Sequence, residues 1–141
     1  MLQNIEHAGT LLAVIIKANY KKEGIAFFTP DDFSQQLGYM NRPKGYIIDP
    51  HVHNLVERKV TLTQEVLFVR SGKVRVDFFD DDKNYIESTI IEAGDVILLA
   101  AGGHGFEILE DAEMIEVKQG PYCGEMDKVR FKSVPENPII K

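Results

Sequence analysis

The feature that most constrains the fold is a succession of short apolar strands in the second half of the chain. Residues 64–79, QEVLFVRSGKVRVDFF, predict two strands around a tight hairpin at Ser71-Gly72. Residues 88–120 predict three more strands, with turns at Ala93-Gly94-Asp95, Gly102-Gly103 and Glu110-Asp111. Many short strands separated by Gly and Asp turns indicate a closed or double-sheet architecture, so we expect an all-β fold.

The first part of the chain predicts one strand and one helix. The apolar run Leu11–Lys17, LLAVIIK, is typical of a buried strand. The stretch 29–40 predicts one short helical segment, with Thr29 as its N-cap, Pro30 in its first turn and Gly38 at its end.

The remaining segments predict an extended stretch and a surface tail. Residues 45–53, GYIIDPHVH, are expected to be extended, and the tail 133–141 contains two prolines and is expected to lie on the surface. No repeat or linker divides the chain, so we expect a single domain spanning residues 1–141.

The charge and cysteine content narrow the expected partners and compartment. A net charge of −6 argues against sequence-independent binding to nucleic acid or to an anionic membrane. The single cysteine, Cys123, allows no internal disulfide, which fits a reducing compartment. No signal-peptide pattern opens the sequence, and the apolar run 11–16 is too short to span a bilayer. We therefore expect a cytoplasmic protein whose partner is a small-molecule ligand.

Two of the four histidines, His51 and His53, lie one residue apart in the stretch 45–53. In an extended segment, side chains alternate between faces, so both imidazoles would point the same way. Converging imidazoles are how proteins begin a metal site or an acid–base pair.

Four short motifs follow one another along the chain, and the first of them contains this histidine pair. In chain order they are a glycine separated by five residues from His-x-His, a glutamate separated by six residues from a glycine, a Gly-Asp pair at the start of a strand, and a histidine after a Gly-containing turn. Together they resemble the two sequence motifs of the cupin superfamily, over residues 45–117. The matching residues are Gly45, His51, His53, Glu65, Gly72, Gly94, Asp95 and His104.

The resemblance departs from the family pattern in the first motif. Eleven residues separate His53 from Glu65, where the family has three or four. Glu57 fits the shorter gap, but no glycine follows it at the family's distance, so Glu57 and Glu65 both remain candidates.

The resemblance implies a double-stranded β-helix, the cupin jelly roll, holding one divalent transition metal ion. Its ligands would be His51, His53, Glu65 and His104, and the ion would be Zn, Mn, Fe or Ni. Glu65 and His51 would also be catalytic, in an isomerase-like reaction on a sugar or sugar phosphate. Alternatives are a metal-free sugar-nucleotide isomerase or epimerase using the histidine pair, a cupin dioxygenase, and a non-catalytic binding or sensing module.

Three further residues are candidates for holding the substrate. Arg58 and Arg75 flank the motif strands and suit an anionic group, although surface pairing with Asp or Glu is the commoner role of arginine. Tyr122 is expected to face the pocket from a loop over the barrel mouth. Cupins also pair through N-terminal strands, so we expect a homodimer formed along Leu11–Lys17.

Overall fold

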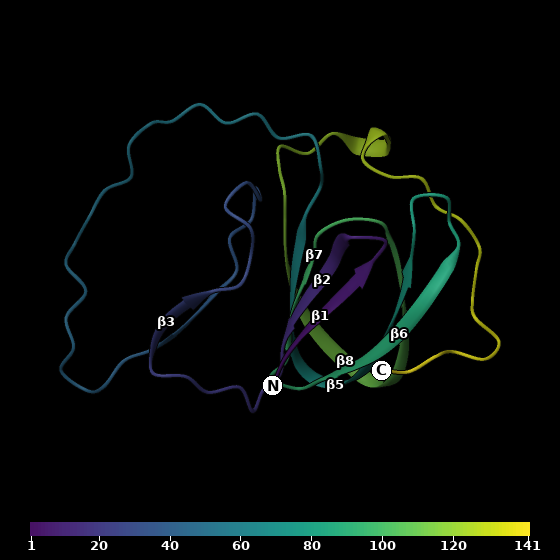
Figure 1. The fold of residues 1–141 in the computed structure, drawn as a ribbon, viewed down its shortest axis with the longest axis horizontal. Coiled ribbons are helices and arrows are strands. Elements are labelled where there is room, and N and C mark those ends of the chain that lie inside the picture. Colours follow the sequence, from purple (N-terminus) through teal and green to yellow (C-terminus); the bar gives the residue numbers. More distant parts are fainter.

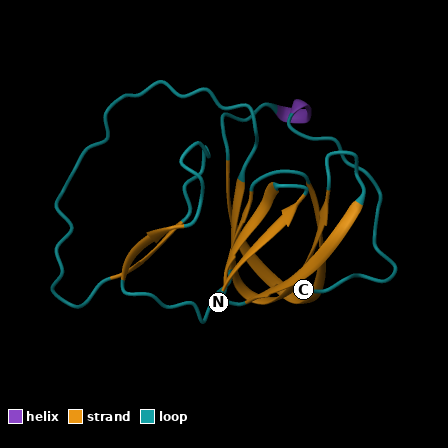
Figure 2. Cartoon of the chain, viewed as in Figure 1, coloured by secondary structure: helices purple, strands orange, loops and turns teal.

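The computed structural model describes residues 1–141, and its fold is built almost entirely of strands (Figure 1). The one helical element is a three-residue 3-10 turn, η1, at Gly124–Met126 (Figure 2), and no helix has the length and apolarity to cross a membrane. The strands are β1 (Leu2–His7), β2 (Thr10–Ile16), β3 (Gly24–Phe27), β4 (Gly38–Asn41), β5 (Glu65–Phe79), β6 (Tyr85–Glu92), β7 (Val96–Leu99) and β8 (Gly103–Lys118).

Six of these strands form one antiparallel sheet that curls into a half-barrel, so the all-β prediction is confirmed. The order is β1-β2-β7-β5-β6, and β8 lies along the other edge of β5. β3 and β4 form a separate two-stranded hairpin that stands beside the barrel (Figure 1).

The apolar run predicted as a buried strand forms β2, which is apolar from Leu11 to Ile16 because both of its faces are covered there. Ala13 and Ile15 pack into the core inside the half-barrel. Val14 and Ile16 pack on the opposite face, against Leu37 and the segment that carries β3 and β4. A strand buried on both faces has no position at which a polar side chain is solvated.

β5 and β8 form one long ladder with a corner in its middle, so the predicted hairpin at Ser71-Gly72 and the predicted turn at Glu110-Asp111 are both wrong. β5 continues through its glycine, and β8 continues through residues 110–111. The register shifts where the two sites face each other, since Ser71 pairs with Glu113 and Lys73 with Glu110. Paired bulges of this kind bend both strands together instead of reversing the chain.

The helix predicted over residues 29–40 is also wrong. Phe33 N–H donates to the Pro30 carbonyl in a single turn, and the chain then passes directly into β4. Thr29 accepts a hydrogen bond from Leu37 N–H, eight residues away, so it closes a loop instead of capping a helix. Phe33 and Leu37 pack on the outer core, and this tertiary contact outweighs the local helix signal.

Residues 45–53, predicted to be extended as a strand, form none. They belong to the arm, residues 42–63, which contains no helix or strand and sweeps around β3 and β4 in a wide arc (Figure 1). A strand needs a neighbour for its backbone groups, and the arm has none.

The β1 and β6 edges of the sheet meet at a seam closed by the end of the tail. Ser88 N–H on β6 donates to the Ile139 carbonyl (2.8 Å), and Lys141 N–H donates to the Ser88 carbonyl (3.0 Å). The Lys141 carbonyl accepts from Thr89 Oγ1 on β6 (2.9 Å) and from Gln3 Nε2 on β1 (3.3 Å). Residues 139–141 are therefore a strap across the seam.

β2 offers no free edge for the predicted dimer contact along Leu11–Lys17. It lies between β1 and β7, and its register pairs Ile5 with Ala13 on one side and Leu99 with Ala13 on the other. The chain covers this strand itself, so that reason for a homodimer is removed.

Candidate functional site

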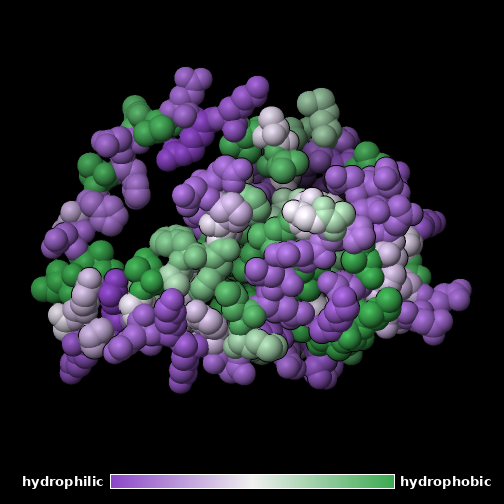
Figure 3. All heavy atoms as spheres, viewed as in Figure 1, coloured by the Kyte–Doolittle hydropathy of each residue, from purple (hydrophilic) through white to green (hydrophobic).

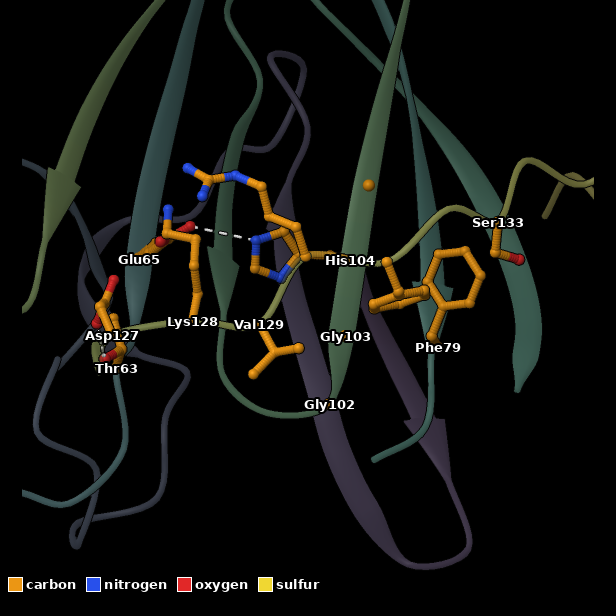
Figure 4. A pocket seen from close by; sticks show the side chains of 13 residues that line it. Thr63, Glu65, Phe79, Gly102, Gly103, His104, Asp127, Lys128, Val129 and Ser133 are labelled. Atoms are coloured by element: carbon orange, nitrogen blue, oxygen red, sulfur yellow. Dashed lines mark hydrogen bonds and ion pairs between the residues drawn. The ribbon is translucent and has the colours of Figure 1, made fainter. Parts of the chain in front are cut away.

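Glu65 and His104 meet at the mouth of the half-barrel (Figure 4). Glu65 is the first residue of β5, where it lies opposite Lys118 in the strand register. His104 lies opposite Phe78, near the other end of the β5–β8 ladder. The bend at the corner brings these two ends together, and His104 Nε2 lies 3.3 Å from Glu65 Oε2. Their partners Leu99 and Phe78 belong to the inner core, so both side chains face the interior.

A cleft of about 470 Å³ opens beside this pair. Its floor is the β7–β8 turn and the start of β8, and its far wall is the tail after η1. Phe131 fixes that wall by packing edge-on against Phe79, with ring centroids 5.1 Å apart. The lining residues are Thr63, Glu65, Phe79, Gly102, Gly103, His104, Gly105, Asp127, Lys128, Val129, Arg130, Phe131 and Ser133.

Two cations, Lys128 and Arg130, and two acids, Glu65 and Asp127, line the cleft. Asp127 accepts hydrogen bonds from Thr63 Oγ1 (2.7 Å) and from Lys118 Nζ (2.5 Å), so one acid offsets one lysine. Lys128 also lines the cleft, and Arg130 has one distant, solvent-exposed ion pair, at 3.8 Å from Glu125. Exposed ion pairs of this kind contribute little to stability, so Lys128 and Arg130 are both available to a ligand.

The environment keeps Glu65 ionised. The hydrogen bond from His104 lowers the pKa of Glu65 below its ordinary value of 4.5, burial opposes this, and the charges of His104, Lys118 and Lys128 lower it further. An ionised carboxylate only accepts hydrogen bonds, so His104 Nε2 carries the hydrogen of the 3.3 Å contact. When the ring is neutral, Nδ1 is then free to accept a proton from a ligand.

His51 and His53 are brought together with each other but not with Glu65 and His104. Their rings lie edge-on with centroids 5.3 Å apart on the exposed arm, and His51 Nδ1 lies 2.9 Å from the Asp49 carbonyl. Neither histidine lines the cleft. Glu57, the alternative carboxylate, is exposed on the same arm.

The side chains therefore do not fit the predicted metal centre in this arrangement. No group of three or more His, Cys, Asp or Glu side chains is placed to hold a metal ion. Glu65 and His104 supply two donors, whereas metal sites of this class have at least three protein ligands.

Arg75, a candidate for substrate binding, is committed to the protein itself. It is 8% exposed and donates to both carboxylate oxygens of Asp77, at 2.7 and 3.0 Å. Its third nitrogen lies 2.7 Å from Glu107 on β8. Ser88 Oγ completes the network by donating to Asp77 at 2.5 Å. The guanidinium thus joins β5 to β8, and Arg75 does not line the cleft.

The other two substrate candidates lie outside the cleft. Tyr122, expected to face the pocket, is 92% exposed and lines a small depression formed by its own loop. Arg58 is on the exposed arm and lines an adjoining surface hollow, which shares Thr63 and Asp127 with the cleft. Neither side chain lines the cleft around Glu65 and His104.

Sequence reasoning missed the cationic wall of the cleft. Lys128 and Arg130 alternate with Lys132 in the stretch KVRFK, the most basic short run after residue 120 of an acidic chain. That basic run could have indicated the cleft wall, but it lies far from the histidine motifs along the chain, so the sequence did not connect the two.

Comparison with family models, with curated proteins and with solved structures gives no match to this chain. The assignment of function therefore rests on the geometry of the cleft and on the cupin-like spacing of the motifs.

Proposed function

We propose that the protein binds a small anionic molecule, of the sugar-phosphate class, in the cleft beside Glu65 and His104. The proposed reaction is an isomerisation in which His104 moves a proton and Glu65 orients its ring. The single observation that carries the proposal is the 3.3 Å contact between Glu65 and His104 in a cleft bordered by Lys128 and Arg130.

The charges support an anionic ligand. Arg130 has a planar guanidinium that matches phosphate or carboxylate, and Lys128 adds a second, compact charge on the same wall. A cleft of about 470 Å³ has the size of a small-molecule site.

The histidine–carboxylate pair supports proton transfer. Imidazole is the side chain whose ordinary pKa lies nearest to neutral pH, and a carboxylate at one ring nitrogen fixes the tautomer and leaves the other nitrogen as base. No step of this proposal passes through a metal ion.

Binding is tested by thermal shift with a panel of sugar phosphates and the matching neutral sugars. We expect stabilisation by phosphates only, and at least a tenfold loss of affinity in Arg130→Ala. Lys132→Ala is the matched control, because Lys132 lies two residues away and does not line the cleft. Equal stabilisation by neutral sugars would remove the proposed role of the cations.

Catalysis is tested by following deuterium incorporation from D₂O into the bound sugar phosphate. His104→Gln should abolish exchange and retain binding, since the cations are untouched. Binding without exchange in the wild-type protein would instead indicate a binding module.

The same assays distinguish the metal-dependent hypothesis. The double variant His51→Ala/His53→Ala should keep full activity here, because both side chains lie outside the cleft. Loss of activity together with loss of a bound transition metal would restore the four-ligand site.

A further inference from the structure

β8 is the longest strand of the protein, and one of its two edges has no partner. It pairs with β5 and with no other strand from Gly103 to Lys118. Along its free edge, alternate backbone N–H and C=O groups therefore point away from the sheet. Proteins rarely leave a long edge unprotected, because it is a template for another strand.

Apolar side chains along this edge are only partly covered. Phe106 and Ile108 pair with Val76 and Val74, which are fully buried, so all four lie on the core face of the sheet. Phe106 is nevertheless 39% exposed and Ile108 52% exposed. β8 is the last strand on this side of the core face, and no further strand covers its apolar side chains.

The arm, in turn, lacks a neighbouring strand with which its backbone could pair. It contains β-type sequence, GYIIDPHVHNLV over residues 45–56, but no strand. Figure 3 shows apolar side chains spaced along its arc, and the exposed ones include Ile47, Ile48, Val52, Leu55, Val56 and Leu62. Neighbouring exposed apolar side chains such as these gain free energy when a partner covers them.

The charges of the two segments are opposite. β8 carries five acidic residues against one lysine, and the arm carries four basic residues against two acids. Among the acids of β8, Glu107 and Glu110 are paired with Arg75 and Lys73 of β5, whereas Asp111, Glu113 and Glu116 have no ion pair. The bases of the arm are Arg42, Lys44, Arg58 and Lys59. Opposite charge favours their encounter and sets their relative orientation.

We propose that the protein forms a two-fold dimer in which the arm of each copy adds as a strand to the free edge of β8 in the other copy. The exchange supplies backbone partners to β8 and buries the apolar residues of both segments. Because each copy offers one arm and one edge, two reciprocal exchanges close the assembly without leaving an open end.

Cross-linking between differently marked chains tests the exchange. In a Cys123→Ser background, Val52→Cys marks the arm of one chain and Ile115→Cys marks β8 of another, both at exposed positions. After mixing and equilibration, a short bis-maleimide should give a covalent dimer. Replacing the arm mark by Val134→Cys, on the exposed tail, should reduce the yield at least tenfold.

Light scattering on the full chain gives the second readout. We expect a dimer at micromolar concentration that Ile48→Asp converts to a folded monomer, whose circular dichroism spectrum loses only the strand signal of the released arm, while Val134→Asp leaves it dimeric. A wild-type monomer, or a dimer whose mixed chains cross-link no better than the control, would overturn the proposal. So would cross-linking within a single chain that carries both marks, because the arm would then cover its own β8.

Discussion

At the scale of single residues, the Glu65–His104 contact couples stability to pH. Its hydrogen bond lowers the pKa of Glu65 in the folded protein below the 4.5 of the unfolded chain, so the ionised form favours folding. The stabilisation is fully present above pH 4.5 and is lost as the pH falls through the lower, folded value. We expect Glu65→Gln to cost about 1–2 kcal/mol at pH 7 and progressively less below pH 4.5.

Urea unfolding at a series of pH values measures this change. Glu116→Gln is the matched control, because it is the same substitution at a residue that is exposed on β8. A Glu65→Gln cost that stays constant from pH 7 to pH 3 would contradict the coupling.

Asp95 is the residue on which the β6–β7 turn depends. It is buried, accepts hydrogen bonds from the N–H groups of Ala18 (2.8 Å) and Glu92 (2.9 Å), and pairs with Lys17. Asp95→Ala leaves these donors without an acceptor, so we expect a loss of about 3 kcal/mol or more in the free energy of unfolding. Asp95→Asn retains one acceptor oxygen and should cost less; equal costs would show that the acceptor is not the important feature.

At the scale of elements, the corner of the β5–β8 ladder requires a glycine. Gly72 has φ = +84°, and a Cβ there would lie 2.1 Å from the Asp111 carbonyl oxygen. Gly9 has nearly the same backbone, φ = +79°, but no atom within 4 Å of its Cβ position. Gly9→Ala should therefore cost only the ~1–2 kcal/mol of left-handed backbone, and Gly72→Ala clearly more, as measured by urea unfolding. Equal costs would mean that the corner can shift to admit a methyl group.

The same corner shows how far the sequence predicts this fold. Alternation and β-branched runs identified the strands from Glu65 onward and β2, because those patterns report local burial. A glycine flanked by strand residues has the same sequence pattern at a hairpin and at a bulge. The sequence therefore predicted a hairpin at Ser71-Gly72, where β5 continues as one long strand. The site was predicted in part: Glu65 and His104 meet, but the arm carries His51 and His53 away, and the cations of the cleft wall come from the distant tail.

At the scale of the whole molecule, the tail from Asp127 onward connects the cleft to the seam. Lys128 and Arg130 form the cleft wall, Phe131 packs on Phe79, and the strap 139–141 joins β6 to β1. Ser88 and Thr89, the β6 residues bound by the strap, are almost fully buried. One segment therefore both closes the half-barrel and positions the charges of the proposed ligand site.

Removal of residues 139–141 should open the seam. The strap forms two backbone hydrogen bonds with Ser88, accepts one from the Thr89 hydroxyl, and pairs Lys141 Nζ with the buried Glu87 at 2.6 Å, so we expect a loss of about 2–4 kcal/mol in the free energy of unfolding. Ile140→Ala keeps the backbone and removes a half-exposed side chain, so it should cost less than 1 kcal/mol. Hydrogen exchange at Ser88 N–H, which donates to the Ile139 carbonyl, should accelerate in the truncated chain and not in Ile140→Ala. If truncation leaves both stability and exchange unchanged, β1 and β6 are held by the sheet itself and the strap is only a surface tail.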